Sequence, residues 1–133
     1  MKSEDIEGLI RHRLNQAQEA LEEARILQEA GRSGLGLVNR SYYAMFYAVL
    51  ALLQQTEQLP RKHQGAISAF DKEFVKRGLF SADMSKDLHR AFELRQVSDY
   101  QITTPLTRAE AEEIFNRASL FVSAVARYLL PMA

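Results

Sequence analysis

Residues 39–53 read NRSYYAMFYAVLALL, the most apolar stretch of the chain, and no charged residue follows Arg40 until Glu57. The stretch lacks Gly and Pro, and its apolar side chains would cover every side of a helix, which is typical of the most buried helix of a bundle. It also carries three tyrosines, although Leu, Ile and Ala would satisfy burial alone. The stretch therefore predicts a central helix whose hydroxyl groups need a further explanation.

The composition is that of a globular protein with one domain, which we expect to span residues 1–133. The chain is 47% hydrophobic and 26% charged, and 17 basic residues balance 17 acidic ones, so net charge favours no particular partner. The absence of cysteine excludes disulfides and thiol chemistry. The acidic N-terminus MKSEDIEGL does not resemble a signal peptide, and residues 41–53 are fewer than the ~18 that a membrane span needs. We therefore expect a cytoplasmic protein without membrane contact.

Helical periodicity appears throughout the chain, and no stretch alternates as a strand does. Ser3 and Gly31 can begin and end the first helix, and Thr107 with Glu110 forms a capping box that opens the last one. The pattern predicts an all-α fold, an antiparallel up-and-down bundle of four main helices plus a shorter one. The expected helices cover residues 4–30, 35–56, 63–77, 81–97 and 107–130, of which 63–77 is the shorter one.

A polar-tipped stripe runs along the central helix. Arg40, Tyr43 and Tyr47 follow one another at spacings of three and four residues, so they share one side of the helix. Tyr42 and Phe46 point to another side and are expected in the core. The stripe is either a set of core tyrosines whose hydroxyls reach the surface or one wall of a binding cleft.

A second patch is PRKHQG, residues 60–65, where a helix begins. The positive charges of Arg61 and Lys62 oppose the helix dipole, which favours an anion at this position; a solvated loop is the alternative. His63 belongs to this patch, and it is far in sequence from His12 and His89. Because no histidine has the spacing of a metal-ligand motif, we expect no metal site.

A third patch is ELRQVSDY, residues 93–100. Arg95 continues the apolar stripe of its helix, an unusual place for a charge. A charge there must be paired or functional, and Asp99 lies four residues on, within reach of Arg95 if the helix continues. The patch is therefore either a structural bridge at the helix end or part of a site.

Together the three patches resemble the HEPN family. The resemblance rests on N-R-S-Y-Y-A-x-F-Y-A, then K-H, then R-x-x-x-D-Y, in order over nearly the whole chain. It implies a small helical bundle that forms homodimers and that is often encoded beside a minimal nucleotidyltransferase as a toxin–antitoxin pair. The domain is also similar to the C-terminal domain of kanamycin nucleotidyltransferase. Active members are metal-independent ribonucleases whose motif is Arg, four to six residues, then His.

The ribonuclease motif is incomplete in this chain. Arg95 matches its arginine, but Tyr100, Gln101 and Ile102 occupy the positions at which a histidine is expected. A phenol, with an unperturbed pKa near 10, is a poor base at neutral pH. The resemblance therefore assigns no firm catalytic residue, and Arg95, Tyr100 and His63 remain candidates.

Three functions stay open. The first is a non-catalytic or weakly active HEPN module that binds a nucleotide, an RNA or a nucleotidyltransferase partner, without a cofactor. The second is a metal-independent ribonuclease toxin that uses Arg95 with Tyr100 or His63. The third is a dimerising structural adaptor. The binding residues expected for the first function are Arg40, Tyr43, Lys62, His63, Arg95, Asp99 and Tyr100.

Overall fold

The structure, a computed structural model, describes residues 3–31, 34–56, 59–97 and 106–130. These residues form helices and no strand, so the predicted all-α fold is confirmed. In chain order the elements are α1 (Ser3–Glu29), α2 (Gly34–Leu53), a 3₁₀ turn η1 (Gln54–Thr56), α3 (His63–Phe70), a π-helical turn η2 (Asp71–Val75), α4 (Ala82–Val97) and α5 (Arg108–Leu129).

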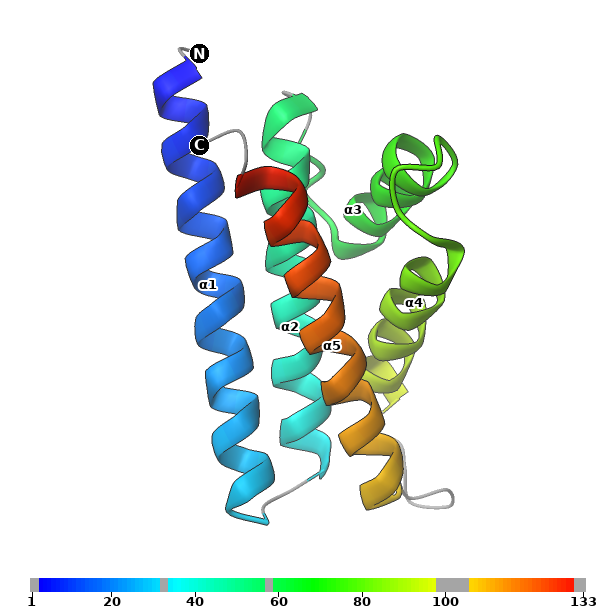
Figure 1. The fold of residues 1–133 in the computed structure, drawn as a ribbon. Coiled ribbons are helices and arrows are strands. Elements are labelled where there is room, and N and C mark those ends of the chain that lie inside the picture. Colours follow the sequence, from blue (N-terminus) through cyan, green and yellow to red (C-terminus); the bar gives the residue numbers. More distant parts are fainter. Residues whose placement is uncertain (1–2, 32–33, 57–58, 98–105, 131–133) are drawn as a thin grey trace.

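Helix α2 is the centre of the bundle. It lies between α1 and α4, and α5 packs along it as well (Figure 1). Successive long helices α1, α2, α4 and α5 run in alternating directions, as predicted for an up-and-down bundle (Figure 1). The shorter α3 packs against α2 and α4. This arrangement brings the start of α3 and the side of α4 to the same central helix.

The helix ends follow the local sequence signals. Gly31 has φ 66° and Gly78 has φ 80°, the left-handed conformation in which glycine ends a helix without strain. The capping box of α5 is present: Thr107 Oγ1 accepts from the Glu110 backbone N–H at 3.1 Å, and the Glu110 carboxylate accepts from the Thr107 N–H at 3.2 Å. The termination signal at Gly31 and the capping box are thus confirmed.

The predicted helix 63–77 is not uniform. It changes at Asp71 into the wider π-helical turn η2, in which Lys76 N–H donates to the Asp71 carbonyl at 2.8 Å. The Asp71 carboxylate faces α4, where it accepts from Ser85 Oγ at 2.6 Å and lies 2.6 Å from His89 Nε2. A local sequence pattern could not predict these contacts, because they join η2 to a different helix, α4.

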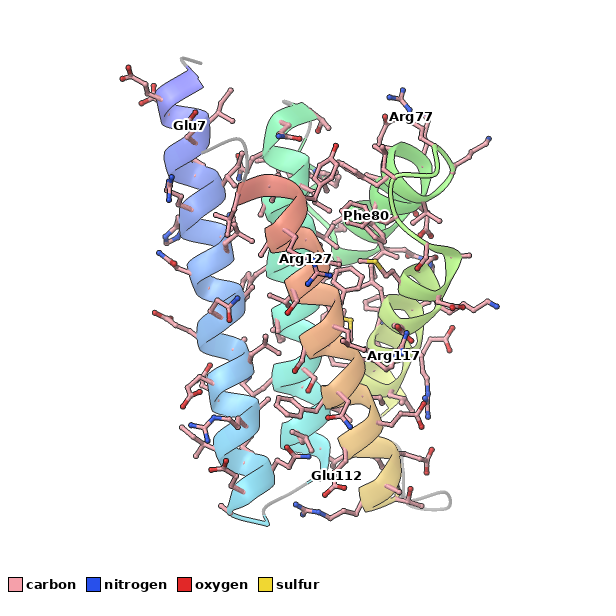
Figure 2. All side chains as sticks on the ribbon, in the orientation of Figure 1. Glu7, Arg77, Phe80, Glu112, Arg117 and Arg127 are labelled. Atoms are coloured by element: carbon pink, nitrogen blue, oxygen red, sulfur yellow. The ribbon has the colours of Figure 1, made fainter. Side chains whose placement is uncertain are left out.

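The core is built mainly from α2, which contributes side chains on all sides. Tyr42, Met45, Phe46, Val49, Leu52 and Leu53 are all buried, as expected. The buried residues of α1 are mostly small, which allows α1 and α2 to approach closely. Charged side chains such as Glu7 and Arg77 point away from the bundle (Figure 2). No helix among the described residues is long and apolar enough to span a membrane.

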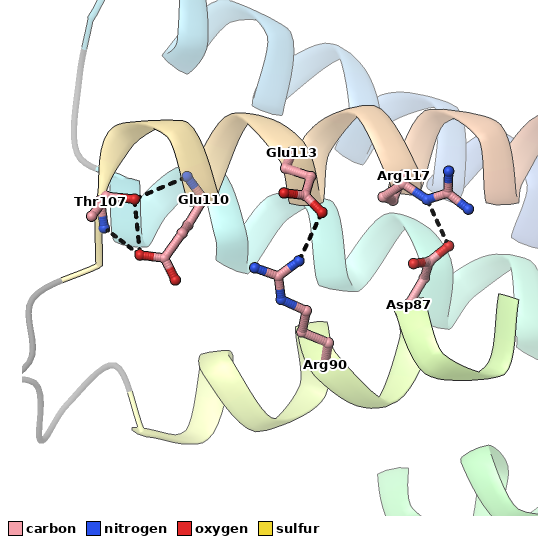
Figure 3. A network of polar contacts seen from close by, with 6 residues as sticks. All are labelled: Asp87, Arg90, Thr107, Glu110, Glu113 and Arg117. Atoms are coloured by element: carbon pink, nitrogen blue, oxygen red, sulfur yellow. Dashed lines mark hydrogen bonds and ion pairs between the residues drawn. The ribbon is translucent and has the colours of Figure 1, made fainter. Parts of the chain in front are cut away.

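Helix α4 is attached to α5 by two ion pairs. Arg117 donates to Asp87 at 2.9 Å, and Arg90 donates to Glu113 at 3.0 Å (Figure 3). Helix α4 also has an apolar side: Leu88 and Ala91 are fully buried, and Met84, Phe92 and Leu94 pack against the core while partly buried. Polar contacts with α5 and η2 and this apolar packing together orient α4, the helix that carries Arg95.

Candidate functional site

His63, the first residue of α3, packs against the aromatic side chains of α2. The hydroxyl oxygen of Tyr42 lies 2.7 Å from His63 Nδ1. Phe46, one turn further along α2, stacks on the imidazole with ring centroids 4.1 Å apart and planes within 3° of parallel. Tyr43 meets the imidazole edge-on, with ring centroids 5.8 Å apart. These contacts from one helix fix both the plane and one nitrogen of the half-buried imidazole.

Arg95 reaches the same aromatic side chains from α4. Its Nη2 donates to the Tyr43 hydroxyl at 2.8 Å. Its Cζ lies 5.0 Å from the ring centroid of Tyr43 and 5.4 Å from that of Tyr42, within the range of a cation–π interaction. These contacts explain why a charge continues the apolar stripe of α4: the guanidinium lies against electron-rich rings and bonds to a hydroxyl. We call Tyr42, Tyr43, Phe46, His63 and Arg95 the His63–Arg95 cluster.

The cluster changes the proton affinity of two of its members. Burial and the positive charge of Arg95 lower the pKa of His63, which favours the neutral imidazole at pH 7. Burial also raises the pKa of Tyr42, and the smaller influence of Arg95 opposes that rise. Tyr42 is therefore a neutral phenol throughout the physiological pH range. At neutral pH the positive charge of the cluster is that of Arg95.

Arg40 lies at the edge of the cluster. Its Cζ is 5.0 Å from the Tyr43 ring centroid, so Tyr43 contacts two guanidinium groups. Arg40 also bonds to Asn39 Oδ1, at 2.9 Å through Nη2, and pairs with Glu23 of α1 at 3.4 Å. Because the Arg40 guanidinium is already paired with Glu23 within the bundle, we expect Arg40 to bind a ligand more weakly than Arg95 does.

Lys62 is the N-cap of α3 and is exposed, and its side chain makes no capping hydrogen bond. It therefore adds positive charge next to His63 in the sequence. Asp99 and Tyr100 lie outside the described residues, so the predicted Arg95–Asp99 pair and the part assigned to Tyr100 stay predictions. Among the described residues, no group of three His, Asp or Glu side chains could hold a metal ion.

The structure brings together three residues that the sequence placed in separate patches: Tyr43, His63 and Arg95. Tyr42 and Phe46, which the sequence placed in the core and outside the three patches, belong to the same cluster. Both are buried, as expected, yet both also contact His63. The sequence offered one indication of this contact: a buried tyrosine hydroxyl usually has a hydrogen-bond partner, so Tyr42 in the core required one.

Hydrogen-bond donors and positive charge dominate this cluster. A guanidinium, an imidazole and a phenol hydroxyl are groups that bind oxygen atoms of phosphate or carboxylate, and the exposed Lys62 adds charge nearby. A ring provides a flat face for an aromatic ligand only where it is exposed, and the half-buried rings of the cluster are those of Tyr43 and His63. The arrangement is therefore suited to an anionic ligand.

Comparison with known proteins finds relatives in bacteria and archaea. The chain is 32% identical over 123 residues to a UPF0332 protein of Thermotoga maritima, which covers 92% of each chain. It is 33% identical over 127 residues to "Putative toxin MJ0605" of Methanocaldococcus jannaschii, covering 96% of this chain and 93% of that protein. With "Putative toxin MJ0142" of the same organism it shares 36% identity over 93 residues, 70% of this chain, and spans 63% of that protein's length. The HEPN domain profile matches residues 10–128, and the chain therefore belongs to the HEPN domain family.

Proposed function

We propose that this chain is an HEPN module that binds the phosphate groups of a nucleotide or an RNA through the His63–Arg95 cluster. One observation carries the proposal. The imidazole of His63 and the guanidinium of Arg95 contact the same two rings: the His63 centroid lies 5.7 Å from that of Tyr42 and 5.8 Å from that of Tyr43, and the Arg95 Cζ lies 5.4 and 5.0 Å from them. Residues of two different helices thus present donors side by side.

The charges around the cluster support an anionic ligand. Arg95 is permanently charged, and its planar group binds phosphate oxygens in pairs. Lys62 is exposed beside His63, and Arg40 contacts the far member of the cluster, Tyr43. The whole chain is neutral, so this positive region is a local feature and not the result of a basic composition.

The proposal includes a protein partner. We infer that the chain is one half of a two-component system with a minimal nucleotidyltransferase, and that it forms a homodimer. The resemblance of its motifs supports the first inference, as do two relatives that are named putative toxins. The same resemblance supports the second inference, because it implies a bundle that forms homodimers.

The binding proposal is tested with a ribose-methylated RNA. A fluorescent single-stranded 2′-O-methyl RNA oligonucleotide cannot be cleaved through its 2′-oxygen, so anisotropy reports binding alone. Arg95→Ala should weaken binding at least tenfold, the size of one lost charge-assisted contact of about 1.4 kcal/mol or more. The matched control is Arg90→Ala, which removes the same charge from the same helix at an exposed ion pair with Glu113. Equal affinities of the two variants would reject the proposed site.

The partner is tested by co-expression. We expect the chain to co-purify with the minimal nucleotidyltransferase encoded beside it, in a ratio that light scattering can measure together with the oligomeric state. If the product of an adjacent nucleotidyltransferase gene showed no binding to this chain by calorimetry, the partner proposal would be contradicted. That result would not bear on the proposed ligand site.

A second function, a metal-independent ribonuclease, is favoured by one specific observation. His63 contacts the same two tyrosine rings as Arg95, so it would supply the imidazole that the motif lacks at Tyr100. Arg95 would then stabilise the charge that develops on the phosphorus centre, and His63 would transfer a proton. Two results would establish this function. Expression of the chain should arrest growth, and both Arg95→Ala and His63→Ala should abolish the arrest. The chain should also cleave unmodified RNA but not 2′-O-methyl RNA.

A further inference from the structure

The hydrogen bond between Tyr42 and His63 has a defined direction. Tyr42 is 0% exposed, and in the part of the chain that the structure describes Nδ1 of His63 is the partner of its hydroxyl, at 2.7 Å. A buried hydroxyl must donate its proton to an acceptor or leave it unsatisfied, which costs about 1–3 kcal/mol. The Tyr42 O–H therefore donates, and His63 Nδ1 accepts.

The direction of this bond determines the tautomer of His63. A neutral imidazole carries one N–H, and when Nδ1 accepts a hydrogen bond the proton resides on Nε2. Phe46 holds the ring plane by stacking, with ring centroids 4.1 Å apart, and turning the imidazole over within that plane would put a C–H in the place of Nδ1 and break the bond to Tyr42. Nε2–H is then the donor that His63 can offer to a ligand.

We propose that Tyr42 is a positioning residue that fixes His63 in the Nε2–H tautomer, so that His63 acts as a hydrogen-bond donor to an oxyanion beside the Arg95 guanidinium. This inference rests on the proposed function for its ligand, but the tautomer itself is a property of the free protein. The ligand class is an oxygen anion, such as the phosphodiester of RNA or the phosphate of a nucleotide. Both supply acceptor oxygens and no proton.

The tautomer also separates binding from base catalysis. A general base must present an unprotonated nitrogen to the hydroxyl that it deprotonates. In His63 the unprotonated nitrogen is Nδ1, which Tyr42 already occupies. Protonation of Nδ1 would force the Tyr42 hydroxyl to turn its proton away inside the core, so Tyr42 opposes formation of the imidazolium. His63 is thus suited to bind a phosphate oxygen and unsuited to start RNA cleavage.

The test observes the two imidazole nitrogens directly. Long-range ¹H–¹⁵N correlation spectra of the full chain, with ¹⁵N-labelled histidine, distinguish a protonated from an unprotonated ring nitrogen. We expect His63 in the wild type at pH 7.5 to show Nε2 protonated and Nδ1 unprotonated. Tyr42→Phe, which keeps the ring but removes the donor, should give a mixture of tautomers. The matched control is Tyr128→Phe, because Tyr128 of α5 packs against Phe74 and Phe80, and none of its ring contacts among the described residues is with the His63–Arg95 cluster.

The ligand part has its own readout in the same samples. Tyr42→Phe should weaken binding of the 2′-O-methyl RNA oligonucleotide about threefold to tenfold, up to the value of one hydrogen bond. Tyr128→Phe should change it by less than about twofold. The wild-type affinity should stay flat between pH 7 and 8, because the donor belongs to the neutral ring.

The outcomes separate the two claims. A wild-type spectrum with the proton on Nδ1 overturns the inference, whatever binds, and this measurement needs no variant that folds. An unchanged tautomer in Tyr42→Phe also overturns it. The expected tautomer with no RNA binding in the wild type would reject the proposed function and the ligand part of the inference, while the assignment of Tyr42 as the donor would stand.

Discussion

The contact of Arg95 with Tyr43 allows a quantitative test of how α4 is held against α2. Tyr43→Phe removes one half-buried hydrogen bond of 2.8 Å and keeps the ring, which should lower the free energy of unfolding by about 1 kcal/mol. Arg95→Ala removes the same bond and two cation–π contacts at 5.0 and 5.4 Å, for a loss of about 2 kcal/mol. Because both variants lose the same hydrogen bond, the double variant should lose about 1 kcal/mol less than the sum.

The assay is urea unfolding followed by circular dichroism at 222 nm, with a common slope for all variants. For 133 residues a loss of about 2 kcal/mol should also lower Tm by roughly 6–10 °C. Arg90→Ala serves as the control, since its exposed pair with Glu113 should contribute less than about 1 kcal/mol. If Arg95→Ala lowered stability no more than Arg90→Ala, or if the two cluster variants were additive, the contacts described for Arg95 would not be formed in solution.

Three further predictions concern single sites. The pKa of His63 is lower in the folded chain than the unperturbed value near 6.5. The contribution of His63 to the free energy of unfolding is therefore complete above about pH 6.5, and that free energy falls as the pH decreases below this value. If a His63→Gln variant showed an equal fall between pH 6.5 and 5 in urea titrations, this prediction would be wrong. Ser41 is 0% exposed and, among the described residues, its hydroxyl lacks a hydrogen-bond partner. Ser41→Ala should therefore raise the urea midpoint, with a gain in stability of up to about 1 kcal/mol. A lowered midpoint would show that the Ser41 hydroxyl does have a partner. Thr107→Ala removes the capping box of α5 and should lose about 1 kcal/mol by the same assay, with a loss below about 0.3 kcal/mol counting against it.

The sequence was sufficient for the helices because their signals are local. The turn of Gly31 needs a positive φ, the capping box of α5 is contained in four residues, and the apolar run of α2 specifies a central helix. None of these features depends on another helix. The π-helical turn at Asp71 is different, because the contacts that accompany it come from Ser85 and His89 on α4.

The candidate site was predicted in parts. Periodicity showed that Tyr43 shares a stripe with Arg40 and that Arg95 lies on the inner side of its helix, but it carried no information on which helices are neighbours. His63 joins the site only because α3 packs against α2 with its first residue. The role of Tyr42 was missed because periodicity sorts whole side chains into buried and exposed, whereas the ring of Tyr42 belongs to the core and its hydroxyl belongs to the site.

The position of Arg95 connects the stability of the bundle with the chemistry of His63. Its guanidinium is held by the Tyr43 hydroxyl and by two rings, and its charge contributes to the lowered pKa of His63. Tyr42 and Tyr43 therefore place the permanent cation, and burial together with that cation lowers the pKa of His63 and favours its neutral form. A charged imidazole beside the Arg95 guanidinium would cost free energy, because the two cations would repel each other in a half-buried space. A neutral His63 avoids this cost and needs no counter-ion within the bundle. An incoming phosphate would then meet one full charge and one directed N–H, an arrangement that favours binding an anion over removing a proton.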